Sequence, residues 1–155
     1  MGYVEKIKIK GHPTVFLGGG ATLRFFGRRD ETRASLKQML ACLHSVVVNL
    51  LRYSEMRGFS QASDEERELR MEMSLSDLRD FRELTDGVGG NLSPPELTRS
   101  IDVVRSFAVI SEVEGADFVR PNIDGIIRSS RWAISNIEKH SSVRLDDRRK
   151  RVLGG

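Results

Sequence analysis

One run of apolar residues constrains the fold of this 155-residue chain more than any other feature. Large apolar side chains return every three or four positions, at Leu36, Met39, Leu40, Leu43, Val47, Leu50 and Leu51. This spacing places one apolar stripe along an α-helix. Asp30 is a good N-cap before it, and Glu31 suits the positive end of the helix dipole. The pattern predicts an amphipathic helix over about residues 31–53, with its stripe buried in a core.

The N-terminal part predicts three β-strands. Ile7 and Ile9 alternate with lysines over residues 3–10, which is the period of a half-buried strand. Residues 13–18 and 20–27 fit a second and a third strand joined by a glycine turn. A sheet this small needs a helix on its face. We therefore expect an α+β fold, in which a small antiparallel sheet of about three or more short strands packs against a cluster of about four helices.

The C-terminal half predicts further core helices. Ser93-Pro94-Pro95-Glu96 combines a capping box with proline at the first helical position. The inward stripe that follows it consists of Leu97, Ile101, Val104, Ala108 and Ser111. After a break at Glu114-Gly115, residues 117–120 are expected to be extended. A last helix from Asn122 or Asp124 turns Ile123, Ile126, Ile127, Ile134 and Ile137 inward, with Trp132 beside them.

Residues 54–92 form a polar middle segment. Asp64–Glu68 could open a short solvent-facing helix, and Leu75, Leu78, Phe81 and Leu84 lie on or near one face of another. Residues 87–90 are rich in glycine, but they lack the spacing of a phosphate-binding loop. We expect residues 1–155 to form a single domain with a polar insertion at about 54–92.

Composition and motifs limit the chemistry. The chain is 39% hydrophobic and 30% charged, as in soluble globular proteins. It has no apolar run as long as a membrane span and no secretion signal. Cys42 stands alone, which excludes an internal disulfide, and His12, His44 and His140 lack the spacing of metal ligands. Because no catalytic motif occurs either, we expect no metal, no cofactor, no membrane partner and no enzymatic activity.

Basic and aromatic residues suggest contacts with RNA. Phe16, Phe25 and Phe26 interleave with arginines, and such surfaces can stack a base and hold its phosphates. The segment 144–151 is a basic tail, for which a solvated chain end is favoured over a nucleic-acid contact. The candidate RNA contacts are Arg24, Arg28, Arg29, Arg148, Arg149 and Arg151.

The order of these parts resembles the cap-binding domain of the orthomyxovirus (influenza-type) polymerase basic protein two, in a divergent, thogotovirus-like form. The resemblance is carried by the three expected strands, Gly27-Arg28-Arg29, the Leu/Val-rich helix, Ser100-Ile101, residues 108–112 and Val119-Arg120. It implies a non-catalytic domain of a viral RNA-dependent RNA polymerase complex that serves cap snatching in transcription. It also implies other polymerase subunits and viral or host RNA as partners, in the host cell nucleus and the virion.

The same resemblance implies a degenerate cap pocket. The positions equivalent to the pocket are Phe16, Leu17, Ala21, Lys37, Val109 and Ile110. Ala21 stands where the family reads guanine with an acid, and Val109 or Ile110 stands where it stacks an aromatic ring. We therefore expect weak or no binding of a methylguanosine cap. Two alternatives stay open: a functional cap or nucleotide site rearranged around Phe16, Arg24 and Phe26, and an unrelated α/β protein-interaction domain.

Overall fold

The computed structural model describes the backbone of residues 18–56, 61–88 and 92–144, and side chains from residue 31 onward outside 57–63 and 89–91. The chain divides into two compact units, Met1–Ala34 and Ser35–Gly155. In the first unit, the described residues from Gly18 onward are helical.

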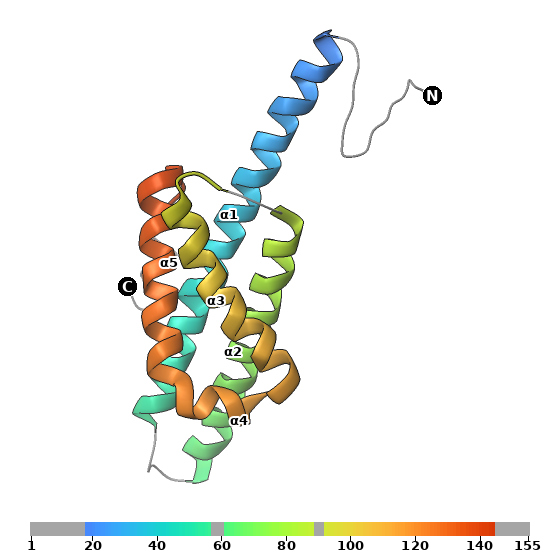
Figure 1. Cartoon of the computed structure of the whole chain (residues 1–155). Coiled ribbons are helices and arrows are strands. Elements are labelled where there is room, and N and C mark those ends of the chain that lie inside the picture. Colours follow the sequence, from blue (N-terminus) through green and yellow to red (C-terminus); the bar gives the residue numbers. More distant parts are fainter. Residues whose placement is uncertain (1–17, 57–60, 89–91, 145–155) are drawn as a thin grey trace. The chain divides into compact units, whose positions relative to one another are not determined.

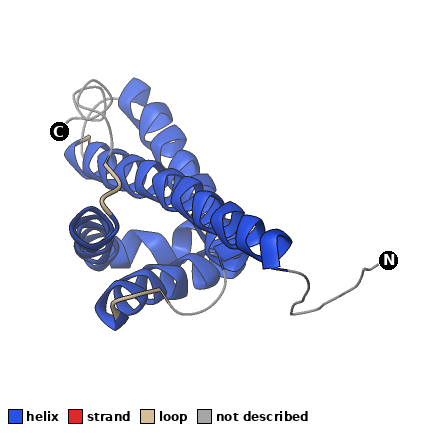
Figure 2. Ribbon diagram, turned by 90° about the horizontal axis from the view of Figure 1, so that it is seen from above, coloured by secondary structure: helices blue, strands red, loops and turns tan. Residues whose placement is uncertain are grey.

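The described residues form helices and loops and contain no strand (Figure 2). The elements are α1 (Gly18–Glu55), α2 (Gln61–Val88), α3 (Pro95–Glu114), α4 (Ala116–Val119), the 3₁₀ helix η1 (Arg120–Asn122) and α5 (Ile123–Ser141). In Figure 1, α1 from Ser35 onward runs down, α2 returns upward, α3 runs down and α5 returns upward. Helix α3 packs against both α2 and α5. The second unit is therefore an antiparallel bundle of four long helices.

The expected α+β fold is wrong. Residues 20–27 lie within α1 instead of forming a strand, while residues 3–10, and all of 13–18 except Gly18, lie outside the described residues. A short apolar run fits a strand or a helix equally well, so periodicity could not decide this segment. Asp30 is not an N-cap, because α1 continues through it. Extending an existing helix is cheaper than starting a new element, so the strongly helical segment after residue 31 favours continuation upstream.

The residues predicted as core stripes on α1, α3 and α5 are buried, except Leu51, which is half-buried. The buried apolar residues of α1 are Leu36, Met39, Leu40, Leu43, Val46, Val47, Leu50 and Tyr53. Every residue of the inward stripes predicted for α3 and α5 is buried as well. Burying large aliphatic side chains stabilises the fold by about 1.5–3 kcal/mol each. These three stripes meet in one hydrophobic core.

Most of the polar segment 54–92 forms the long helix α2. Met71, Leu78 and Phe81 on this helix are buried in the same core. Leu78 and Phe81 share one helix face, as expected from the sequence. Two shorter helices predicted for this segment are thus one continuous helix of 28 residues that completes the bundle.

The connection from α3 to α5 differs from the prediction. The break at Glu114-Gly115 is confirmed, because Gly115 ends α3 with φ 67°. Residues 117–120 are not extended: Val119 ends the single turn α4, and Arg120 begins η1. Asn122 precedes α5, as predicted.

The start of α3 uses different hydrogen bonds from a capping box. Pro94 is the N-cap, no side chain caps the helix, and the Leu97 amide donates to the Pro94 carbonyl at 2.9 Å. Thr98 Oγ1 instead accepts from the Leu92 amide at 2.8 Å and donates to the Leu92 carbonyl at 2.7 Å. The predicted position of the helix start is right, but Ser93 does not supply the cap.

Candidate functional site

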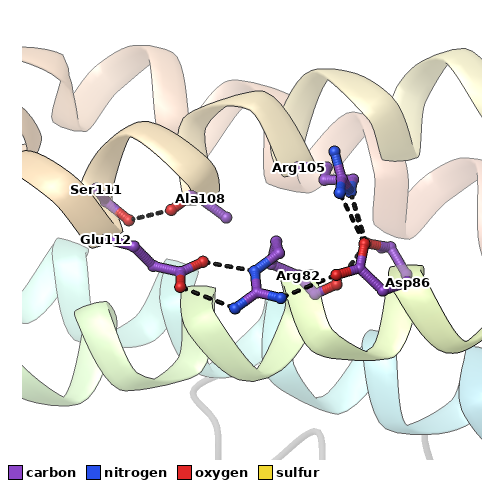
Figure 3. A network of polar contacts seen from close by, with 7 residues as sticks. Arg82, Asp86, Arg105, Ala108, Ser111 and Glu112 are labelled. Carbon is purple, nitrogen blue, oxygen red and sulfur yellow. Dashed lines mark hydrogen bonds and ion pairs between the residues drawn. The ribbon is translucent and has the colours of Figure 1, made fainter.

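The most conspicuous polar cluster joins α2 to α3 (Figure 3). Arg82 donates to both carboxylate oxygens of Glu112, at 2.6 and 2.8 Å, and to Asp86 at 2.8 Å. Asp86 also accepts from Arg105, at 2.7 Å. These arginines lower the pKa of both carboxyl groups, and the two acids raise the pKa of Arg82. Because the four charges neutralise one another, this cluster is a structural link between helices and not a ligand site.

A second polar cluster lies between α1 and α2. Ser45 donates to Asp77 at 2.5 Å, and Asn49 donates to Ser45 at 3.1 Å and accepts from Arg70 at 2.9 Å. One turn further along α1, Tyr53 lies under the guanidinium of Arg67, at 4.4 Å from the ring centre. These groups bond mainly to one another, although Nε of Arg70 is buried without a hydrogen-bond partner among the described residues.

A cavity with a volume of about 610 Å³ lies between α1 and α5. Ligand sites commonly fall in this size range. The residues that line it are His44, Val47, Val48, Leu51, Arg131, Ile134, Ser135, Glu138, Lys139 and Arg144. We call this cavity the α1–α5 cleft. It combines an apolar wall of valine, leucine and isoleucine with three cationic side chains.

Three cations on α5 differ from Arg82 and Arg105 in having no ion pair among the described residues. In the part of the chain that the structure describes, Arg128, Arg131 and Lys139 are exposed and make no ion pair. Trp132, the only tryptophan in the chain, is 39% exposed beside them. Helical spacing puts Arg128 one turn before Trp132 and Lys139 two turns after it, on the same side. We call Arg128, Arg131, Trp132 and Lys139 the basic face of α5.

Arg144 connects this face to the basic tail. Its guanidinium donates to the carbonyl oxygens of Glu138 and Val143, while the side chain lines the α1–α5 cleft. Arg144 is also the last described residue. Arg148, Arg149 and Arg151 lie four to seven positions further along the chain, outside the described residues.

The described part of the chain gives side chains for three of the residues predicted for a cap pocket. Phe16 and Leu17 lie outside it, and Ala21, Arg24, Arg28 and Arg29 are helical residues of α1 whose side chains are not described. Lys37 is exposed on α1, and Val109 and Ile110 are exposed on α3. None of these last three lines the α1–α5 cleft.

Sequence reasoning missed the basic face of α5. The available signal was the set of cations at positions 128, 131 and 139 around Trp132, on the side opposite the predicted isoleucine stripe. His44 is partly buried and lines the cleft.

No group of three or more His, Cys, Asp or Glu side chains among the described residues could hold a metal ion. Residues Glu31–Glu55 form a helical stretch long and apolar enough to cross a membrane by length and composition. Since Leu40, Leu43, Val46 and Leu50 of this stretch are fully buried in the bundle, packing accounts for its apolar character.

Comparison with known proteins gives no relative: no family model, no curated protein and no solved structure matches this chain.

Proposed function

We propose that this chain is a non-catalytic module that binds single-stranded RNA along the basic face of α5 and the rim of the α1–α5 cleft. One observation carries the proposal: the exposed cations of α5 surround an exposed tryptophan and have no acidic partner among the described residues. Arginines that serve the fold, such as Arg82 and Arg105, are paired with carboxylates.

Single-stranded RNA fits the chemistry of this surface. Arginine and lysine neutralise phosphates and release condensed counterions, which provides affinity without sequence specificity. An indole can stack on an unpaired base, and this stacking is worth about 1–3 kcal/mol per base. Bases in a duplex are already stacked, so Trp132 favours a single strand. A surface of this kind needs no catalytic group.

The direct test measures binding of a fluorescently labelled oligouridylate by anisotropy. Trp132→Ala should weaken binding on the order of tenfold because a base loses its stacking partner. Trp132→Phe should retain most of the affinity, since a ring remains. Equal loss in both variants would remove stacking from the proposal.

The cations are tested by salt dependence. Arg131→Ala should weaken binding and reduce the slope of log affinity against log salt by about 0.7, the value for one single-strand phosphate contact. Arg79→Ala is the matched control, because Arg79 is an exposed arginine on α2 outside this face. The proposal fails if the wild-type chain does not bind the oligonucleotide, or if Arg131→Ala and Arg79→Ala behave alike.

The basic tail is a second candidate for contact with RNA. Neutralising Arg148, Arg149 and Arg151 together should weaken binding and flatten the salt dependence further. An unchanged slope of log affinity against log salt would indicate that the tail is a solvated chain end. The basic face of α5 would then be the binding surface.

A narrower proposal places the module in the polymerase of a segmented negative-strand RNA virus, in the nucleus and the virion. Its support is the sequence resemblance, now without the expected sheet, together with a surface suited to RNA. Co-purification with the other polymerase subunits tests it.

Within this setting we expect no preference for a methylated cap analogue, because Ala21 and Val109 or Ile110 replace the acid and the ring of the family's pocket. Calorimetric titration with methylated and unmethylated guanosine triphosphates distinguishes this from a rearranged cap site.

A further inference from the structure

The two walls of the α1–α5 cleft differ in chemistry. The wall from α1 is largely aliphatic: Val47 is buried, and Val48 and Leu51 are half-buried. The wall from α5 and the residues after it carries the three cations, with Ile134 as its large apolar side chain. The described residues that line the cleft include no Phe, Tyr or Trp, so they offer no such ring on which a nucleobase could stack. An aliphatic wall suits a hydrocarbon chain, whose burial is favourable in proportion to its apolar area.

The directions of the helices give the cleft two different ends. Helices α1 and α5 run antiparallel, so residues early in α1 lie level with residues late in α5 (Figure 1). Leu51 therefore lies toward the end of the cleft that holds Arg131, and His44 lies toward the end that holds Lys139 and Arg144. We call the second the cationic end, because two of the three cations lie there beyond the aliphatic wall.

The cleft carries an excess of positive charge. Its three cations are accompanied by a single acid among the described lining residues, Glu138. Helix α1 adds no other acid, because its sequence has none between Glu31 and Glu55. Positive charge at one end of an aliphatic wall is complementary to a molecule that has one anionic group and an apolar chain.

Arg144 is positioned for such an anionic group. Its Nη1 donates to the carbonyl oxygens of Glu138 and Val143, which holds the guanidinium at the cationic end. Its Nε and Nη2 make no hydrogen bond to the described residues. Two parallel N–H groups of an arginine can bind both oxygens of a carboxylate. Lys139 is exposed at the same end and adds a second charge.

We infer that the α1–α5 cleft binds a free fatty acid, with the carboxylate at the cationic end and the hydrocarbon chain along the aliphatic wall toward Leu51. In this arrangement Arg144 and Lys139 hold the carboxylate. A free acid suits a cavity with the volume of a small-ligand pocket, whereas a lipid in a bilayer would present only its head group. The inference does not rest on RNA binding, because the aliphatic wall belongs to α1 and not to the basic face of α5.

Calorimetric titration with dodecanoate below its micelle concentration, without RNA, tests the site. Octanoate, decanoate and dodecanoate should bind progressively more tightly, by up to about fourfold per methylene, because each added methylene is buried. Dodecanol should bind on the order of tenfold more weakly than dodecanoate, since it lacks the charge-assisted hydrogen bonds to Arg144. Vesicles of an anionic phospholipid that bind the chain while dodecanoate does not would indicate a membrane contact and overturn the inference.

Variants test the two parts of the cleft separately. Arg144→Ala should weaken dodecanoate binding on the order of tenfold, because the carboxylate loses its partner. Arg99→Ala, at an exposed arginine on α3, is the matched control and should change nothing. Val48→Phe should weaken binding as well, because the larger side chain fills part of the cleft. Thermal melting followed by circular dichroism confirms that each variant is folded, and equal affinities in Arg144→Ala and Arg99→Ala would overturn the inference.

The orientation of the ligand gives an independent readout in the wild-type chain. Nuclear Overhauser effects should connect the terminal methyl group of dodecanoate with Leu51, and the methylene next to the carboxylate with His44. The reverse order, or contacts of the chain only outside the cleft, contradicts the inference. A wild-type chain that does not bind dodecanoate overturns it too, whatever the outcome of the RNA experiments.

Discussion

Ser45 on α1 donates a 2.5 Å hydrogen bond to Asp77 on α2, and this pair sets an acid in the packed seam between the two helices. Burial raises the pKa of Asp77, and the hydrogen bond from Ser45 acts in the opposite direction. Asn49 also approaches the same carboxylate oxygen, at 3.5 Å. The seam thus holds an acid for which ionisation is costly and hydrogen bonding is favourable.

Replacing the Asp77 charge should stabilise the bundle at neutral pH. A raised folded-state pKa gives stability that is fully present below the unfolded value of 3.8 and is lost as pH rises through the folded value. Asp77→Asn keeps an acceptor for Ser45 and cannot ionise, so its melting temperature should gain on the wild type between pH 4 and pH 7. Asp77→Ala should instead cost about 1–3 kcal/mol, because Ser45 loses its buried acceptor. Equal losses in both variants at pH 7 would contradict this account.

The link between α2 and α3 should have the opposite pH dependence. Arg105 and Arg82 lower the pKa of Asp86, and Arg82 lowers that of Glu112. Their contribution is present above the unfolded values of 3.8 and 4.5 and is lost as pH falls through the folded values. Arg82→Gln should therefore lower the melting temperature at pH 7 and change it little at pH 2. Arg52→Gln, at an exposed arginine on α1, serves as the control, and a pH-independent loss in Arg82→Gln would indicate lost packing.

The contribution of α2 to the core can be measured at Phe81. This side chain is fully buried, so Phe81→Ala should cost about 3–5 kcal/mol of unfolding free energy, through lost burial and the cavity left behind. Leu69→Ala on the same helix is the control, because Leu69 is 53% exposed. Denaturant unfolding measures both. Similar costs for the two variants would show that α2 is not packed as described.

Gly115 allows the corner between α3 and α4. Its φ of 67° and ψ of −147° lie in a region nearly exclusive to glycine, so Gly115→Ala should cost about 1–3 kcal/mol. A Cβ at this position would meet no atom within 4 Å, so the cost is one of backbone conformation. Gly87→Ala is a matched control in equally open space but within α2, and it should be neutral or stabilising. If both substitutions are neutral, the corner tolerates another conformation.

The sequence predicted the long helices well where the apolar period was sustained. The stripe from Leu36 to Leu51 covers several turns, and no strand could bury it on one face. The segment 20–27 is too short to show a sustained apolar pattern. Whether it forms a strand or a helix therefore depends on the helix that follows it. Residues 117–120 are also too few to show a pattern. The connection between Gly115 and Asn122 has room for little more than one helical turn between α3 and α5.

The candidate site was harder to predict because it depends on which charges find partners. Asp124 lies four residues before Arg128, a spacing that permits an ion pair, yet none forms between them. Arg82, by contrast, pairs with Glu112, thirty residues away, across two helices. The sequence therefore suggests an ion pair between Asp124 and Arg128, which does not form, and gives no sign of the ion pair between Arg82 and Glu112, which does. The cations without acidic partners could be recognised only after the helices were packed.

The position of Trp132 has a spectroscopic consequence. Because it is the only tryptophan and lies on the basic face of α5, partly in water, the chain carries one intrinsic fluorophore at the proposed RNA surface. Its emission should be quenched when a nucleobase stacks on the indole, without any attached dye. Unfolding exposes an indole that is already partly hydrated, so the shift in emission wavelength should be small. The intensity of Trp132 emission would then report RNA binding, while its wavelength would change little on denaturation.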